Sequence, residues 1–506
     1  MKKFSVFDLD IDYNAEPARI LHKIPDVWET DCFDSYEIVS PSISSLIELC
    51  AKKLLSDVCM LRNISSQVPK SIQAFLLNKA ISLKRTLSIA FLLKCYPYEK
   101  FVYPSPVNWN TWTVFCENFK IGARDIDVIF RDNVEIIFST FCSLIREKRL
   151  NNPLRVVDMQ YLSVDASRIC EKMWAESVRC TESNQPSPYI LKIHVNITSD
   201  VELKSLTQVI YNSTFVSKLN LSITGLNFCN SLFVDKNVLA LLEQVDPEKL
   251  KVCQFDFCSI KPSMRTTIMK LQKFQNLKAL NLNYSSMEIR HFPSHLQTLS
   301  KTLNNLPILE RLSLKGCSLR GHLPTLFHNV CETVRCNVKR RKPSLHSECC
   351  LNHRGTLKYL NISSCDLVDG DLVYFRELEI CKLLQNLDIS CNSFSAECMG
   401  ESLELLASNL VVLYMDYSIS KTDLTPFISQ IHKMKKLKCL RMGGVPFTVE
   451  NIAKLVCEIR AMPYLKCVSA SFTKLRSEIY EDQDLLIKTD TTTRKVSLHV
   501  LDYSPD

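Results

Sequence analysis

The chain has 506 residues, enough to bury a large core or several smaller ones. Its hydrophobic fraction of 46% is ordinary for a globular protein, and a net charge of +8 is too mild over this length to demand nucleic acid as a partner. The 9 glycines argue against Gly-rich phosphate loops, and no stretch approaches the ~18 uninterrupted apolar residues of a membrane span.

The 23 cysteines are scattered through apolar stretches and form no C-x-x-C pair. The first residues run into acidic positions at once and lack the apolar core of a signal peptide. We therefore expect reduced, buried thiols in a protein of the cytoplasm, with the nucleus as a second compartment, and no membrane partner.

In chain order, residues 1–40 are interpreted as an N-terminal extension and residues 41–80 as a helical module with two short motifs. The first motif, S/T/P-L-x-x-x-C-x-x-x-aliphatic, is met by Ser45, Leu46, Cys50 and Leu54. Ser45 followed by Glu48 has the form of a capping box, which predicts a helix start at the motif. Leu46, Cys50 and Leu54 then recur every four residues, on or near one helix face.

The second motif, hydrophobic-P-x-x-hydrophobic-x-x-x-hydrophobic, is met by Val68, Pro69, Ile72 and Leu76. Proline suits the first turn of a new helix, on which the three apolar residues would share a face. The two motifs in this order resemble an elongin-C-binding box followed by a cullin-2 box. The alternative is that both faces pack against the chain's own helices.

After a helical linker over residues 81–150, residues 151–476 carry copies of the pattern L-x-x-L-x-L-x-x-N/C-x-L. Alternate apolar residues would point inward from a short strand, and the N/C residue would turn the chain and bond neighbouring backbone. This predicts an α/β leucine-rich-repeat solenoid, a horseshoe with parallel strands inside and helices outside. An early degenerate copy begins at Leu154, and the later copies begin at Val216, Leu250, Leu277, Leu309, Leu357, Leu384, Leu410, Leu437 and Leu465.

The interval from Leu309 to Leu357 is nearly two periods long, which predicts an insertion at about residues 329–355. Its Cys and His residues lack the paired spacing of a zinc site, so incidental cysteines in a loop are the favoured interpretation over a metal centre. The run Lys339-Arg340-Arg341-Lys342 fits a nuclear-import signal or a solvated charge run. Residues 477–506 are interpreted as a C-terminal cap or tail.

The order of these parts resembles the PRAME family, including its leucine-rich-repeat-containing protein 14 branch. The run 68–77 is similar to that family's L-P-R-E-L-F-P-P-L-F, the run 153–159 to its L-R-V-L-D-M/L strand, and the run 309–323 to its L-R-E-L … L-x-G-R-L-D-Q-L-L stretch. The resemblance implies a substrate receptor of a cullin-2 ubiquitin ligase. Elongin C, bound to elongin B, would then contact Leu46, Cys50 and Leu54, and cullin-2 with its RING subunit would contact Val68, Pro69, Ile72 and Leu76.

The expected function is that of a non-catalytic adaptor, because no hydrolase, kinase, P-loop or metalloprotease motif is present. No cofactor is expected. A client protein would bind strand positions that alternate with buried ones, although each position also fits a merely solvated strand face. The alternative function is a scaffold that binds a signalling protein without forming a ligase. The predicted client-binding residues are Asn281, Asn283, Ser313, Lys315, Asn361, Ser363, Asp388, Ser390, Tyr414 and Asp416.

Overall fold

The computed structural model divides the chain into two compact units. One contains Asp31–Cys253, and the other contains Met1–Thr30 and Gln254–Asp506, with the division inside strand β7 (Val252–Asp256). The structure describes residues 11–12, 46–65, 67–83, 85–102, 136–141, 143–144, 153–171, 190–212, 220–229, 232–256, 259–261, 264–284, 293–327, 356–376, 383–406, 409–419, 423–465, 467–473, 482–490 and 495–501.

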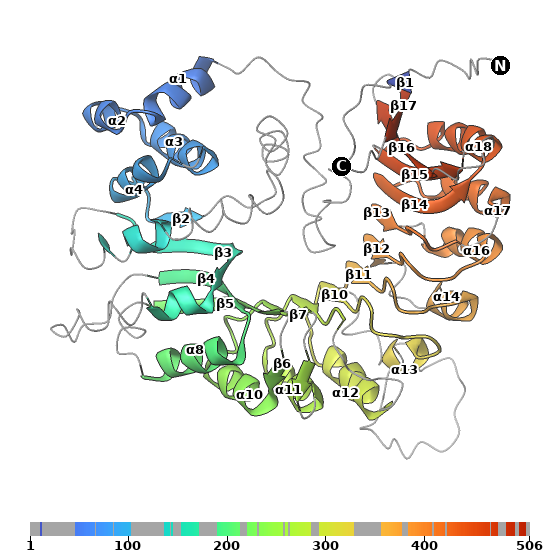
Figure 1. Cartoon of the computed structure of the whole chain (residues 1–506), viewed down its shortest axis with the longest axis horizontal. Coiled ribbons are helices and arrows are strands. Elements are labelled where there is room, and N and C mark those ends of the chain that lie inside the picture. Colours follow the sequence, from blue (N-terminus) through green and yellow to red (C-terminus); the bar gives the residue numbers. More distant parts are fainter. Residues whose placement is uncertain are drawn as a thin grey trace, which may run out of the picture. The chain divides into compact units, whose positions relative to one another are not determined.

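Four helices open the first unit, as the sequence predicts: α1 (Leu46–Leu55), α2 (Val58–Ser65), α3 (Lys70–Ser82) and α4 (Thr86–Lys94). Asp57 starts α2, because its carboxylate accepts hydrogen bonds from the backbone N–H groups of Cys59 and Met60. The Ser88 hydroxyl donates to the carbonyl of Leu55, which ties α4 to the end of α1 inside the core. The four helices thus form one packed module (Figure 1).

The same unit continues with a parallel sheet in the order β2-β3-β4-β5, made of β2 (Lys100–Val102), β3 (Val156–Asp165), β4 (Ile190–Ile197) and β5 (Asn220–Cys229). Strand β6 (Leu232–Val234) and helices α8 (Asp200–Asn212) and α10 (Asp235–Gln244) follow. The sequence prediction missed β4, where Leu191, Ile193 and Asn196 fit the middle of the repeat pattern but Pro188 and Thr198 replace its first and last apolar residues. A second signal is strict alternation, with Leu191, Ile193 and Val195 fully buried.

The second unit confirms the predicted fold class, an α/β leucine-rich-repeat solenoid, with an open ladder of parallel strands from β9 to β15 and helices along one side of it (Figure 1). Its strands are β8 (Ser259–Lys261), β9 (Ala279–Asn281), β10 (Arg311–Ser313), β11 (Tyr359–Asn361), β12 (Asn386–Asp388), β13 (Val412–Tyr414), β14 (Cys439–Phe447) and β15 (Cys467–Thr473). Its helices are α11 (Met264–Lys270), η4 (Leu271–Lys273), α12 (Pro293–Asn304), α13 (Leu323–Phe327), α14 (Asp369–Arg376), α16 (Ala396–Leu406), α17 (Thr425–Ile428), η6 (Ile431–Lys433) and α18 (Val449–Arg460).

In four successive repeats the N/C residue bonds the backbone of the repeat before it, as predicted. The thiols of Cys317 and Cys365 donate to the carbonyls of Leu282 and Leu314, and the Ser418 hydroxyl donates to that of Ile389. Asn392 does more, since its amide donates to the carbonyl of Ile362 and accepts from the N–H groups of Cys365 and Leu367. These buried side chains link successive turns of the solenoid by hydrogen bonds.

One residue earlier, the backbone turns through positive φ in the repeats of β9 to β14. Four non-glycine residues occupy this position, namely Tyr284, Ser364, Cys391 and Tyr417, and glycines 316 and 444 occupy it in the other repeats. A β-carbon on Gly316 would collide with the ring of Tyr284, and one on Gly444 would collide with the ring of Tyr417. Each tyrosine ring therefore covers the glycine of the next repeat, where only glycine leaves room for it.

The C-terminal end of this ladder is closed by antiparallel strands. Strand β16 (Asp482–Asp490) pairs with β15, β17 (Lys495–Leu501) pairs with β16, and the two-residue strand β1 (Ile11–Asp12) pairs in parallel with β17. These additions cover an edge of β15 that would otherwise expose unpaired backbone groups. Ser45 and the predicted insertion at 329–355 lie outside the described residues.

Candidate protein-binding site

Of the first motif, Leu46, Cys50 and Leu54 lie on α1, and Cys50 is on the side turned away from the module's core. At about 100° per residue, positions 46, 49 and 50 fall on one side of a helix, and positions 51 and 55 fall on the other. Leu49 is 51% exposed and Cys50 is exposed, whereas Ala51 and Leu55 are buried. Leu54 is half-buried between the two faces, and only the backbone of Leu46 is described. The helix thus presents apolar side chains to the outside.

The second motif surrounds the start of α3, which begins directly after Pro69, as predicted. The Gln73 side chain donates to the carbonyl of Val68 and helps to hold this turn. Pro69 is exposed, Val68 is half-buried and Ile72 is 38% exposed. Leu76 is only 2% exposed, so its predicted cullin contact is wrong in this conformation. One further turn along α3 carries Leu76 into the core of the module, where Leu77 and Ile81 are also buried.

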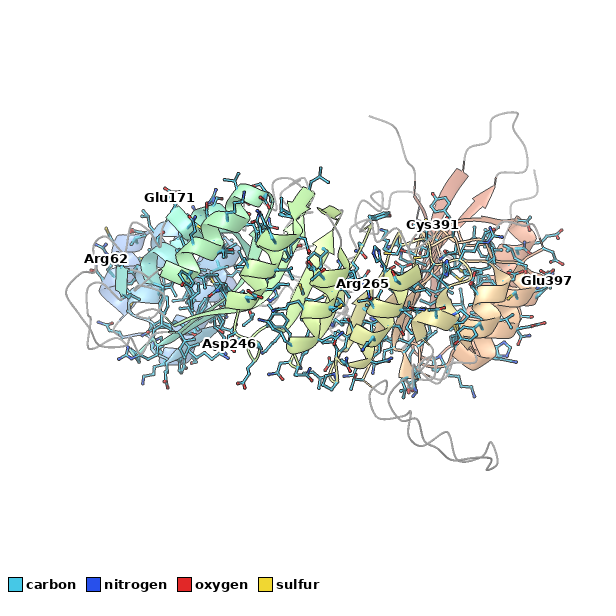
Figure 2. The ribbon with its side chains drawn as sticks, turned by 90° about the horizontal axis from the view of Figure 1, so that it is seen from below. Arg62, Glu171, Asp246, Arg265, Cys391 and Glu397 are labelled. Atoms are coloured by element: carbon cyan, nitrogen blue, oxygen red, sulfur yellow. The ribbon has the colours of Figure 1, made fainter. Side chains whose placement is uncertain are left out.

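Other side chains extend the outer surface of the module. Met60 on α2 is exposed, and so is Leu87 at the start of α4. Arg62 is exposed on α2, with its guanidinium 5.8 Å from the ring centroid of Phe91 on α4 (Figure 2). Sequence reasoning did not single out Leu49 or Met60, although the helical period of the first motif places Leu49 beside Cys50.

The predicted client-binding positions lie on the strand face, but nearly all of them are buried. Only Lys315 is partly exposed. Asp388, the least buried of the other nine, is 9% exposed, which corrects the prediction that these side chains face a client. Neighbouring parallel strands lie close enough for short side chains to be shielded on both sides. The buried residues are Asn281, Asn283, Ser313, Asn361, Ser363, Asp388, Ser390, Tyr414 and Asp416.

Most of these side chains bond the backbone or one another. The side-chain oxygens of Asn281, Asn361 and Asp388 each accept a hydrogen bond from the backbone N–H two residues later. Burial raises the pKa of Asp388, although Ser390 opposes this rise by donating hydrogen bonds to the carboxylate. The recurring bond holds the chain as it leaves the strand, so these residues are structural.

Longer side chains reach out from the same face. The Arg311 guanidinium lies 4.4 Å from the ring centroid of Tyr359, and the Lys315 ammonium lies 5.7 Å from that of Tyr284. Arg441 lies 5.0 Å from the ring centroid of Tyr414 and forms an ion pair with Asp416. Aromatic rings of neighbouring strands therefore hold several of the cations of this face in place.

Cysteine reactivity is the other chemical feature of the described residues. Burial raises the pKa of Cys365 to about 12, so this thiol stays protonated. Cys391, in the turn after β12, is exposed (Figure 2). The described residues contain no cluster of His, Cys, Asp and Glu suited to a metal ion. Among the same residues, no helix combines the length and apolar character needed to cross a bilayer.

The chain is similar to one named relative. Leucine-rich repeat-containing protein 14 of Xenopus laevis is 21% identical over 473 residues, which cover 85% of this chain and 88% of that protein. No family model matches the chain. Among solved structures, the crystal structure of a TDR receptor is 12% identical with a TM-score of 0.28, over 62% of this chain and about half (52%) of that one. With the repeat fold, the first likeness indicates a repeat-based protein-interaction role.

Proposed function

We propose that this chain is the substrate-recognition subunit of a cullin-2–elongin B/C ubiquitin ligase. The helical module would dock the ligase, and the leucine-rich repeats would hold the client. The observation that carries the proposal is the outward apolar face of α1, where Leu49 is 51% exposed beside an exposed Cys50. A face that served only the chain's own packing would be covered by α2, α3 or α4.

Elongin C would receive this face. An exposed leucine supplies apolar area to a partner pocket, and the small thiol of Cys50 lets a partner helix approach closely. Lys52 and Lys53, also exposed, leave the surroundings of the patch polar, as is usual at the rim of an interface.

Cullin-2 would bind beside it, at the start of α3. Val68, Pro69 and Ile72 offer a short apolar surface there, and Leu76 supports it from within the core. Ubiquitin transfer would then follow from proximity, because a held client lysine meets the ubiquitin-loaded enzyme at high effective concentration.

The first test is co-purification of the full chain with elongin B–elongin C after co-expression. The wild type should elute as one complex, and a Leu46→Ser/Cys50→Phe double variant should lose it. Asn78→Ala, which changes an exposed residue of α3 outside both motifs, is the control and should keep it. Circular dichroism must show that both variants fold.

The cullin contact is tested separately on the purified complex with elongins. Ile72→Asp should abolish binding of cullin-2 with its RING subunit while elongin binding persists. Ser71→Asp introduces the same charge at the neighbouring exposed position and should have little effect. If the wild type captures no elongin, the ligase proposal fails. The protein is then the non-ligase scaffold, an alternative favoured by the burial of Leu76.

A further inference from the structure

A basic cluster lies along three neighbouring strands of the repeats. It consists of Lys278 and Lys358, which directly precede β9 and β11, and of Arg311 and Lys315 on and just beyond β10. Strand β10 pairs with both β9 and β11, so the four residues belong to three adjacent strands. Arg311, Ser313 and Lys315 occupy alternate positions, and so they share one face.

Nearby acidic groups do not cancel this charge. The carboxylate of Glu310 lies between two lysines of the cluster, 3.7 Å from the ammonium of Lys278 and 4.0 Å from that of Lys358. Asp416, farther along the ladder, is held by Arg441. Asp388 is buried, and burial raises its pKa, although the nearby charge of Lys315 lowers it. The four cations therefore outnumber the carboxylates of Glu310 and Asp388 beside them.

The cluster is also accessible and pre-positioned. The side chains of Lys278 and Lys358 are 50% and 44% exposed. The intervening polar residues, including Ser313 and Asn361, are buried and lie below the ends of the long cationic chains. The rings of Tyr359 and Tyr284 restrain Arg311 and Lys315, which lowers the entropy cost of binding.

We infer that this basic cluster is the docking site for an acidic segment of the client protein. The inference rests on the proposed function, for which it names the class of client. Carboxylates suit the site because an arginine guanidinium binds them in a bidentate geometry and the flanking lysines add charge. A protein segment fits better than nucleic acid, because the cluster is small and sits among buried neutral side chains, without a long basic stripe.

The experiment measures binding to the full chain alone, without elongins, by fluorescence anisotropy. The probes are a fluorescein-labelled ten-residue glutamate peptide, the equivalent lysine peptide and a ten-nucleotide single-stranded oligothymidine. The glutamate peptide should bind, the lysine peptide should not, and the affinity should fall as salt screens the charges. Because no elongin is present, this result is independent of the ligase test.

Variants then locate the site. Arg311→Gln/Lys315→Gln should weaken glutamate-peptide binding at least fivefold, and Lys278→Gln/Lys358→Gln should have a similar effect. The second pair alters two exposed residues, so it keeps the test valid if the first pair impairs folding. Lys301→Gln/Lys435→Gln removes the same charge from two other exposed positions, one of them on α12, and should change affinity less than twofold.

Two results would overturn the inference. One is glutamate-peptide binding that is absent, or that falls equally in the control pair. The other is oligothymidine binding tighter than peptide binding at the same salt, which would assign the cluster to nucleic acid.

Discussion

Replacing Asn392 with alanine tests whether the N/C residues hold the repeats together. This side chain is buried, and its oxygen accepts from the backbone N–H groups of Cys365 (3.1 Å) and Leu367 (3.0 Å). Its amide nitrogen donates to the carbonyls of Ile362 (3.0 Å) and Ile389 (2.8 Å). Alanine removes every one of these bonds at once.

The expected loss follows from the groups left without this partner. The carbonyl of Ile389 still accepts from the Ser418 hydroxyl, so the two N–H groups dominate the loss. A buried donor left unsatisfied costs about 1–3 kcal/mol, so two of them give a loss of about 2–6 kcal/mol in the free energy of unfolding. Typical domains have only about 5–15 kcal/mol, so the effect should be large.

The assay is urea unfolding followed by circular dichroism, with hydrogen exchange of peptides covering residues 362–370. Asn392→Ala should lower the midpoint and speed exchange at Cys365 and Leu367. Ser393→Ala, at the exposed next residue, is the control and should leave both unchanged. If both variants unfold at the wild-type midpoint with wild-type exchange, the reasoning about this residue is refuted.

Three further results are expected. Gly444→Ala should destabilise the chain by about 1–3 kcal/mol in thermal unfolding. This loss should exceed that of Gly321→Ala, because Gly321 shares the positive φ but has no atom within 4 Å of the added carbon. Adding Tyr417→Ala to Gly444→Ala should remove the difference between the two losses. Burial, with Lys251 adding to it and Asp158 opposing it, lowers the pKa of His194 to about 4. The unfolded chain therefore binds the extra proton between about pH 6.5 and pH 4, so stability should fall as the pH drops through that window, and His194→Gln should flatten this part of a pH–stability curve. In native alkylation read by mass spectrometry, Cys50, Cys391 and Cys457 should react at once while Cys365 stays unmodified until the repeats unfold; equal rates would contradict its burial.

Local signals in the sequence were sufficient for much of the architecture. The pattern around Leu357, Leu360 and Ile362 predicted β11 and its buried residues, because each copy of the repeat folds with the same local geometry. Pro69 marked the start of α3 because its fixed φ and missing N–H suit a helix start. The bonding role of Cys365 and Asn392 also followed from their position in the pattern.

Burial on the strand face depended on tertiary structure. Asn361 and Asp388 alternate with core residues, a pattern that fits either a solvated face or a ladder of buried bonds. Which one forms depends on the side chains of strands that are adjacent in space but some 25 or more residues apart in the chain, such as Asn361 and Asp388 themselves. The burial of Leu76 has the same cause. The helical period puts Leu76 on the same face as Ile72, but the packing of the module buries Leu76 and leaves Ile72 exposed. Sequence periodicity specifies which residues share a face, and the neighbouring elements decide how much of that face a partner can reach.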